Sequence, residues 1–359
     1  MSLTVTAIVV SYNRAGLLQE CLDALAAQTR HPDRVIVIDN ASTDGAADVA
    51  KRHSLQPEVT VLDHNVGGAG GFCAGIACAL AAAADSDADN GTDDTGSYGN
   101  AAAASAAHGT TTRPNTRRIN NSQQANQYVW LMDDDTIPTA TALEALLAAA
   151  GEARERNGVW PAVLGSKALW TDGREHLMNK PRPRTWRALG AANLERSAEA
   201  FQVRSLSFVS CLTNARMIES ARALPRAAYF LWNDDYEYTT KLLRHATGYY
   251  VPESLVVHKT KVFGSSDADP GERFFFEVRN KLWILRFSRG NFTTAEYAEL
   301  LLKTLRRWAL TYWRSANRAV ILDCFKRGLR EGLGQRPAGN AELLAGNPDI
   351  VAAIGAVEG

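Results

Sequence analysis

The chain has 359 residues, 46% of them apolar, which is enough for two domains or for one large α/β domain with an extension. Lysine plus arginine and aspartate plus glutamate balance at 39 each, so no global positive field points to a nucleic-acid partner. The five cysteines are scattered without zinc-finger spacing, and we expect reduced core residues in a cytoplasmic protein. No apolar run reaches the roughly 18–20 residues that span a bilayer, and the amino terminus lacks a signal-peptide pattern, so we expect a soluble or peripheral protein.

Strands and helices alternate along the first 84 residues. We predict buried strands over 3–10, 34–38 and 59–62, and apolar residues between 17 and 25 recur at helical spacing. Such alternation is typical of a parallel sheet with right-handed crossovers. Each strand ends in a polar loop, so the loops should converge on one edge of the sheet, where open α/β sheets bind nucleotides.

The composition changes between residues 85 and 126, where small and polar residues dominate. Such a segment cannot bury enough apolar surface to offset its ordering entropy. We predict a disordered surface insertion, which is a simpler interpretation than a binding role.

After the insertion, residues 128–138 run from an apolar stretch into three carboxylates. We predict a buried strand whose carboxyl end presents Asp133 and Asp135 to the same side, because side chains two apart in an extended chain share a face. Two hard oxygen ligands suit Mg²⁺ or Mn²⁺ carrying substrate phosphates. The alternative is a helix start with an aspartate N-cap and Pro138 in the first turn, and one loop could serve both purposes.

The rest of the α/β pattern follows in order. We predict a helix to about residue 156, strands around 161–169 and 201–210, a short helix from 214, a helix through 242–243, a strand over 254–257 and a helix over 274–287. We therefore divide the chain into a catalytic domain over 1–270 and a helical region over 271–333.

The helical region is strongly basic. Between Lys303 and Arg330 eight basic residues stand against one acid, with aromatic residues between them. A basic helix with aromatics fits the surface of an anionic membrane. The alternative is an amphipathic helix packed on the catalytic domain with a solvated basic face. Residues 334–359 are rich in glycine and alanine, and we expect a loose tail.

Motifs in a fixed order resemble those of family 2 glycosyltransferases. They are the loop Ser-Tyr-Asn-Arg at 11–14, the acidic turn 39–45, the glycine-rich run 65–72 and the carboxylates 133–135. The resemblance implies an α/β protein of the GT-A fold, a Rossmann-like mixed sheet flanked by helices, which transfers sugars from nucleotide diphosphates with inversion. Residues 232–238 and 256–260 look like the branch that contains bacterial galactofuranosyltransferases and some rhamnosyltransferases.

The resemblance implies which residues meet the nucleotide sugar. Asp39 has the family position of the carboxylate that accepts the N3–H of uracil, and the alternative is an N-cap of the next helix. Asp134 would touch the donor sugar or the ribose. The remaining members of this set are Ser11, Tyr12, Asn13, Arg14, Asn65, Gly67, Gly68, Gly70 and Gly71. The glycines lack the spacing of a dinucleotide fingerprint, so they predict either close backbone approach to a ligand or a tight turn with helix–strand packing.

The resemblance also implies the metal and the base. Asp133, Asp135 and His258 match the family's positions for ligands of Mn²⁺ or Mg²⁺. Asp235 matches the catalytic position, where a general base faces the acceptor hydroxyl, and Asp234 is its competitor.

Three further side chains are assigned to the acceptor. Glu237 is the third catalytic candidate and should orient an acceptor sugar, although an acidic first turn favoured by the helix dipole is the alternative for this whole run. Trp170 and Trp232 are predicted to stack on acceptor sugars, or else to be ordinary buried tryptophans.

Together these inferences predict a metal-dependent inverting transferase. The expected donor is UDP-galactofuranose, and the expected acceptor is a polyprenyl-diphosphate-linked glycan at the cytoplasmic face of the cell membrane. The alternatives are a rhamnosyltransferase that uses dTDP-rhamnose, a nucleotidyltransferase of related topology, or a noncatalytic binder of sugar nucleotides.

Overall fold

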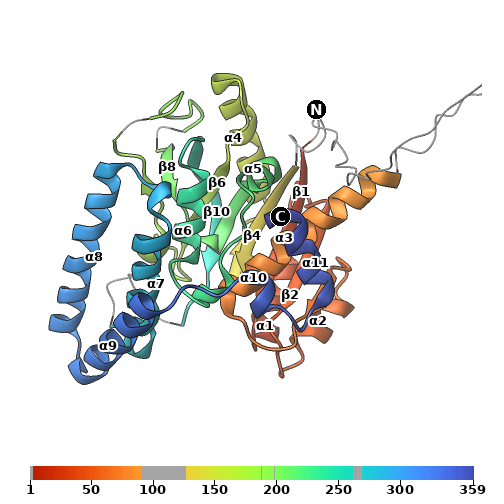
Figure 1. The fold of residues 1–359 in the computed structure, drawn as a ribbon. Helices are drawn as coiled ribbons and strands as arrows, with labels where there is room; N and C mark the ends of the chain where they lie inside the picture. The colour runs from red at the N-terminus through yellow and green to blue at the C-terminus, as the bar shows by residue number, and fades with distance from the viewer. Residues whose placement is uncertain (1–2, 90–126, 187, 198, 262, 264–268) are drawn as a thin grey trace, which may run out of the picture.

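The computed structural model describes residues 3–89, 127–186, 188–197, 199–261, 263 and 269–359 (Figure 1). Its core is a ten-stranded mixed sheet. The strands are β1 (Thr4–Ser11), β2 (Arg34–Asp39), β3 (Glu58–Val61), β4 (Gln127–Asp133), β5 (Thr136–Pro138), β6 (Val163–Leu169), β7 (Arg182–Pro183), β8 (Phe201–Ser205), β9 (Cys211–Asn214) and β10 (Gly248–His258). In space they run β3-β2-β1-β4-β9-β6-β10-β8-β7, and β5 pairs with β10.

Helices cover both faces of this sheet. One face packs against α1 (Ala15–Ala26), α2 (Ala46–Arg52) and α4 (Ala142–Asn157). The other face packs against α3 (Gly67–Asp89), α5 (Ala215–Ala221), α6 (Asp234–Leu242) and α11 (Pro348–Glu358). The predicted α/β architecture is therefore confirmed.

The first half of the sheet is parallel, as predicted. Strand β1 pairs in parallel with β2 and β4, and β2 pairs in parallel with β3. Alternate side chains of β1 feed the two cores, because Val9 packs with α1 and α2 whereas Ile8 and Val10 pack with α3. Burial on both faces explains why this strand reads as a continuous apolar run.

The second half of the sheet departs from the prediction. The strand expected over 201–210 is present only over its first half, because β8 ends at Ser205 and a 3₁₀ turn follows at Phe208–Ser210. Strand β9 then runs antiparallel between β4 and β6. The indole of Trp130 in β4 donates to Ser210 Oγ at 2.9 Å and so fixes the bend that delivers β9.

The chain does not enter a helix directly after the three carboxylates. Asp133 ends β4, and β5 then pairs antiparallel with β10, placing Pro138 opposite Val256. Helix α4 begins only at Ala142 with Thr141 at its N-cap. The helix-start alternative for the carboxylates is therefore wrong, since none of them caps α4.

The helices of residues 271–334 lie beside the sheet, and we call them the C-terminal pillar (Figure 1). Helix α7 (Phe274–Phe287) has the predicted bounds. The rest of the helical region predicted over 271–333 consists of two helices, α8 (Thr294–Arg314) and α9 (Arg318–Gly334). The break between them is stabilised by Asn317, whose side chain accepts a hydrogen bond from Val320 N. The division of the chain at residue 270 stays a prediction.

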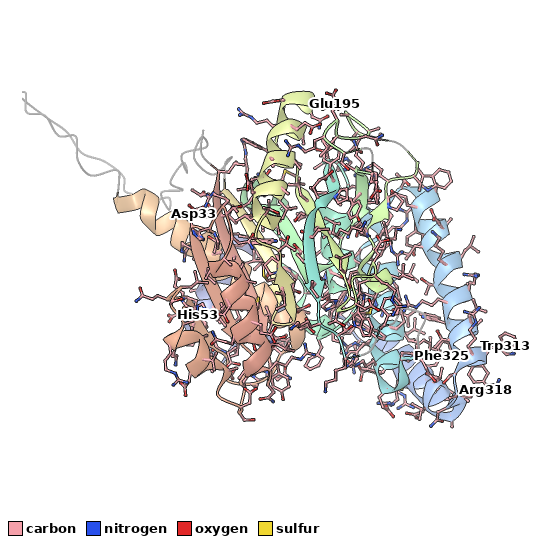
Figure 2. All side chains as sticks on the ribbon, turned by 180° about the vertical axis from the view of Figure 1, so that it is seen from behind. Asp33, His53, Glu195, Trp313, Arg318 and Phe325 are labelled. Carbon is pink, nitrogen blue, oxygen red and sulfur yellow. The ribbon has the colours of Figure 1, made fainter. Side chains whose placement is uncertain are left out.

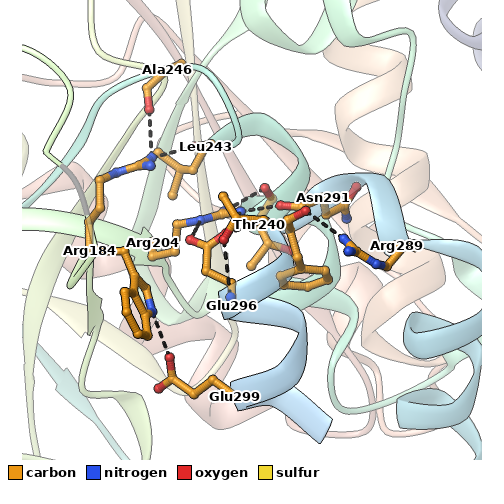
Figure 3. Close-up of polar contacts among 12 residues, drawn as sticks. Arg184, Arg204, Thr240, Leu243, Ala246, Arg289, Asn291, Glu296 and Glu299 are labelled. Atoms are coloured by element: carbon orange, nitrogen blue, oxygen red, sulfur yellow. Dashed lines mark hydrogen bonds and ion pairs between the residues drawn. The ribbon is translucent and has the colours of Figure 1, made fainter.

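A polar network fastens the start of α8 to the sheet (Figure 3). The buried guanidinium of Arg204 in β8 donates to Glu296 Oε1 at 2.8 Å, to Thr240 O at 2.7 Å and to Asn291 O. Glu296 also closes a capping box with Thr293. Arg184 donates to the carbonyls of Leu243 and Ala246, as the same figure shows. The pillar therefore has a fixed orientation toward the catalytic edge.

The loose tail predicted for 334–359 is wrong. The chain crosses back from α9 to the sheet, forms α10 (Asn340–Leu343), and ends in α11, which lies against α3 (Figure 1). Ile350, Ile354 and Val357 of α11 are buried in the same core as α3. Asn340 Oδ1 accepts from Ala227 N at 2.8 Å and anchors the return.

Three sequence inferences concern features outside the sheet. Most of the predicted insertion lies outside the described residues, and α3 itself extends to Asp89. All five cysteines are free thiols. Among the helices of the described ranges, none is long and apolar enough to cross a membrane.

Candidate active site

A cavity of about 490 Å³ opens where the predicted loops converge. The loops after β1, β2, β3 and β4 form one side, and the segment 230–235 before α6 forms another. His258 at the end of β10 closes the floor, while Arg273, Glu277 and Arg307 reach the cavity from the C-terminal pillar. The edge predicted from the strand order is thus the place where the polar residues meet.

Asp133, Asp135 and His258 form an acidic cluster in this cavity. One ligand atom from each lies within 4.8 Å of the others. Burial, followed by the charges of Asp135 and Asp134, raises the pKa of Asp133 well above its usual range. Carboxylates crowded in this way are relieved by a cation.

The atoms of this cluster fit a divalent ion. Asp135 Oδ1 is buried without a hydrogen bond, and it lies 3.2 Å from His258 Nε2. Neighbouring corners of an octahedron of oxygen-type ligands around Mg²⁺ are about 2.9 Å apart, close to this separation. Oxygen and imidazole donors also suit Mn²⁺. The predicted ligand set is therefore brought together by the fold.

Asp134, predicted to touch the donor, is tied to the loop after β1. Its carboxylate accepts from Ser11 Oγ at 2.9 Å, Tyr12 N at 3.3 Å and Arg14 Nη1 at 3.2 Å. Burial raises the pKa of Asp134 to about 6, against the lowering effects of Arg14 and Ser11. Arg14 also donates to Asp135 Oδ2 at 2.7 Å. These contacts fix the loop after β1 against the side-chain cluster of Asp133, Asp135 and His258.

Asp39 is fully buried at the end of β2 and does not itself line the cavity, although the next residue, Asn40, does. One oxygen accepts from the backbone and hydroxyl of Ser42, whereas Oδ2 is buried without a hydrogen-bond partner. Helix α2 begins at Ala46 with Gly45 at its N-cap, so the N-cap alternative for Asp39 is wrong. Asn13, predicted to bind the nucleotide, does not line the cavity; its Oδ1 accepts from Thr43 N at 2.8 Å and joins two loops.

The glycines of the run 65–72 lie in two different surroundings. Gly67 and Gly68 line the cavity with Asn65, and Gly67 has φ +72° with Phe230 O only 2.0 Å from where a Cβ would stand. Gly70 and Gly71, also predicted to bind the ligand, lie away from the cavity. A Cβ at either would come within 2.4 Å of a side chain, that of Val66 or of Val10. For these two positions the helix–strand packing alternative is the correct one.

The segment before α6 has an unusual backbone. Phe230, Trp232 and Asn233 all have positive φ, which L-residues rarely adopt. The side-chain amide of Asn280 in α7 donates to the carbonyls of Tyr229, Leu231 and Trp232 at 2.8–3.0 Å. A single buried side chain thus holds the strained segment that carries Asp234 and Asp235.

Asp234 and Asp235 both line the cavity at the start of α6 and differ in charge state. Burial, then the charge of Asp235, raises the pKa of Asp234 to about 8. Burial also raises the pKa of Asp235, but the backbone N–H of Tyr236 and the charges of Lys281 and Arg182 lower it. Lys281 and Arg182 thus favour the charged form of Asp235, whereas the neighbouring charge of Asp235 disfavours the charged form of Asp234.

Two predicted acceptor residues lie outside the cavity. Glu237 is buried behind α6, where Oε1 accepts from Ser288 Oγ at 2.7 Å and pairs with Arg226 at 3.5 Å. Trp170 donates to Thr260 O at 3.1 Å and packs on Phe263. Their polar atoms bond to other groups of the protein, and the acceptor assignments of Glu237 and Trp170 stay predictions. Trp232 does line the cavity.

Several lining residues were not predicted. Asn179 comes from the polar stretch after β6, and Glu277, Arg273 and Arg307 come from the helical pillar. Glu277 is buried and accepts from Asn233 Nδ2 at 3.0 Å. The sequence marks Glu277 only as an acid among the aromatic residues at the start of α7. It does not indicate that this face of the helix would point to the cavity.

Comparisons with known proteins agree with the fold and the motifs. Residues 6–83 match the family Glycosyl transferase family 2. Galactofuranosyltransferase GlfT1 of Mycobacterium tuberculosis is 44% identical over 90 residues, which are 24% of this chain and 29% of that protein. GlfT1 of Mycolicibacterium smegmatis is 38% identical over 81 residues, 23% of this chain and 27% of that protein. The chain thus matches less than a third of the length of these relatives.

A solved structure extends the comparison to the whole fold. Staphylococcus aureus TarS 1–349 in complex with UDP-GlcNAc aligns with a TM-score of 0.53 at 16% identity, covering 99% of this chain and 90% of that one. At this identity the likeness concerns the fold alone. The GT-A architecture implied by the motifs is confirmed.

Proposed function

We propose that the protein is a metal-dependent inverting glycosyltransferase, and we start from the match of residues 6–83 to the family Glycosyl transferase family 2. The observation that carries the proposal is the meeting of two sets of groups in one cavity. The cluster of Asp133, Asp135 and His258 lines the same cavity as the carboxylates Asp234 and Asp235. One set suits a nucleotide diphosphate, and the other suits a hydroxyl nucleophile.

The donor would occupy the side formed by β1, β2 and β4. A divalent ion on Asp133, Asp135 and His258 would stabilise the charge that develops on the departing diphosphate. Asp39 Oδ2, buried without a partner, is a suitable acceptor for the N3–H of uracil. The positive φ of Gly67 keeps the backbone of the third loop close to the cavity.

The acceptor hydroxyl would approach from the side of α6. Asp235 would take its proton as the hydroxyl oxygen attacks the anomeric carbon on the face opposite the leaving nucleotide, which inverts the configuration. Asp234 cannot share this task at neutral pH, because its raised pKa keeps it protonated. Trp232, which lines the same cavity, would contact the acceptor sugar.

The proposed donor is UDP-galactofuranose, supported by the galactofuranosyltransferase relatives, which match 24% and 23% of the chain. The proposed acceptor is a glycan on a polyprenyl diphosphate. A rhamnosyl donor on dTDP is the same-class alternative, because the shared motifs do not specify the sugar.

Helix α8 supports a peripheral place on the cytoplasmic face of a membrane. Its inner face packs through Leu300 and Trp308, while an outer stripe is apolar and exposed. Leu302 and Trp313 in that stripe are 68% and 67% exposed, and Trp313 projects away from the body beside Arg318 (Figure 2). Basic residues flank the stripe, as anionic lipid requires.

Point substitutions test the membrane contact better than truncation, because α8 and α11 cover the core. Leu302→Gln with Trp313→Gln should lower binding to phosphatidylglycerol vesicles by roughly tenfold or more, judged by sedimentation. Val159→Gln, an exposed apolar residue elsewhere, is the control. Equal partition of the double variant and the wild type would contradict this placement.

The metal-dependent activity is tested by donor binding. Wild-type protein should bind UDP with Mn²⁺ and lose most of this affinity in EDTA, and Asp135→Ala should bind equally weakly under both conditions. An Asp135→Ala protein that keeps Mn²⁺-dependent affinity would remove the metal assignment. A noncatalytic binder is identified if UDP-sugars bind but are never transferred or hydrolysed.

A further inference from the structure

We infer that Asn179 is a positioning residue of the metal site, which fixes His258 in the tautomer whose Nε2 lone pair faces Asp135. The inference rests on the metal site of the proposed function. It assigns a role to a residue from the polar stretch after β6, which no motif singles out.

The hydrogen bonds around His258 define the tautomer. Asn179 Oδ1 lies 2.8 Å from His258 Nδ1. Because a carbonyl oxygen only accepts, Nδ1 carries the hydrogen, and the neutral ring then has its lone pair on Nε2. The amide of Asn179 is oriented by its other end, where Nδ2 donates to Ser207 Oγ at 3.3 Å.

This tautomer explains the contact with Asp135. His258 Nε2 and Asp135 Oδ1 are 3.2 Å apart, yet the buried oxygen accepts no hydrogen bond. A proton or a cation between these two atoms satisfies both of them. The arrangement therefore also suits a divalent ion that takes the place of the proton.

The surroundings hold the ring in this position. His258 is buried, and the ring of His176 packs against it with centroids 4.9 Å apart. His176 is itself bonded through Nε2 to Thr260 Oγ1 at 3.0 Å. Arg14 acts on the second ligand in the same way, since it holds Asp135 by Oδ2 and leaves Oδ1 for the ion.

A side chain that hydrogen-bonds to a metal ligand affects the affinity of the site for the metal. Removing the partner of a metal-bound histidine weakens metal binding by about 10–100-fold. Asn179→Leu removes the acceptor and should produce a loss of this size. Asn179→Asp keeps an acceptor for the Nδ1 hydrogen and should bind within about threefold of wild type, which a merely structural asparagine would not predict.

The test uses the full-length, ligand-free protein and Mn²⁺ alone. Free Mn²⁺ is followed by electron paramagnetic resonance, and Asn347→Leu serves as a matched control, because Asn347 bonds to the remote Asp63. Nitrogen-15 NMR of the histidine rings reports the tautomer of His258 in the wild type, so the inference is tested even if Asn179→Leu does not fold.

The outcomes separate this inference from the proposed function. A protonated Nδ1 in the wild type, weak binding by Asn179→Leu and recovery in Asn179→Asp support the role of Asn179. Hydrogen on Nε2 with none on Nδ1, or unchanged Mn²⁺ affinity in a folded Asn179→Leu protein, overturns it. A wild type that binds no Mn²⁺ overturns the metal site itself, and this role with it.

Discussion

Replacing Asp235 by asparagine should abolish transfer and spare the donor. The amide keeps the size of the side chain but cannot take the proton of the acceptor hydroxyl. Loss of a general base costs about 10²–10⁴-fold in rate, or roughly 3–5 kcal/mol of transition-state stabilisation. Donor affinity should stay within about twofold of wild type, because the metal cluster and Asp39 are untouched.

The matched control is Asp234→Asn. This residue already carries a proton at neutral pH, since its pKa is about 8, so the amide mimics its resting state. A carboxyl whose pKa is higher in the folded protein than in the unfolded chain makes the folded protein less stable as the pH rises from about 4 to about 8. Asp234→Asn removes that loss and should raise the melting temperature at pH 8, while retaining most of the transfer rate.

The assay is transfer under single-turnover conditions, with Mn²⁺ and donor saturating, followed by UDP release and by product formation. A fully active Asp235→Asn protein beside an inactive Asp234→Asn protein would exchange the two assignments. Equal and modest losses of transfer rate in both variants would contradict the assignment of Asp235 as the base.

Three further predictions follow from the same contacts. Mn²⁺ affinity should rise with pH, because the raised pKa of Asp133 means that binding releases a proton, and a flat profile in pH-dependent calorimetry would contradict this. Gly71→Ala should cost about 1–3 kcal/mol in urea unfolding because its Cβ meets a strand side chain, whereas Gly68→Ala, which has open space, should keep stability and weaken donor binding. Arg204→Met should cost about 3–5 kcal/mol in the same unfolding assay, because it leaves the partly buried Glu296 without its guanidinium partner and removes the bonds to Thr240 O and Asn291 O.

The parallel half of the fold was predictable because its signals are local. Strands β1 and β2 are buried on both faces and end in polar turns, so their apolar runs and boundaries can be read directly. Strand β9 could not be predicted in this way. Its position between β4 and β6 depends on the bend at Ser210, which a distant tryptophan stabilises.

The C-terminal tail had a signal that was missed. Pro348 stands in the first turn of α11, and Ile350, Ile354 and Val357 recur at helical spacing. Glycine and alanine content outweighed this pattern in the prediction, although alanine is the strongest helix former. The burial of α11 against α3 supplies the remaining stabilisation.

The site was predictable where motifs end strands and unpredictable elsewhere. Asp133, Asp135 and His258 follow β4 and β10 and meet as expected. Glu237 and Trp170 do not line the cavity, because sequence proximity to a motif does not determine the direction of a side chain. Asn179 and Glu277 come from segments that only the tertiary fold brings to the cavity, so no spacing along the chain could indicate them.

The proposed metal-dependent sugar transfer is tested most directly with a panel of donors in the presence of Mn²⁺. UDP- and dTDP-sugars are incubated with the protein, and slow hydrolysis and transfer to a polyprenyl-diphosphate glycan are recorded. The account predicts turnover of UDP-galactofuranose, dependent on Mn²⁺, with inverted configuration in the product. Turnover of dTDP-rhamnose alone would contradict the donor assignment, and binding of UDP-sugars without turnover of any would contradict the proposed activity.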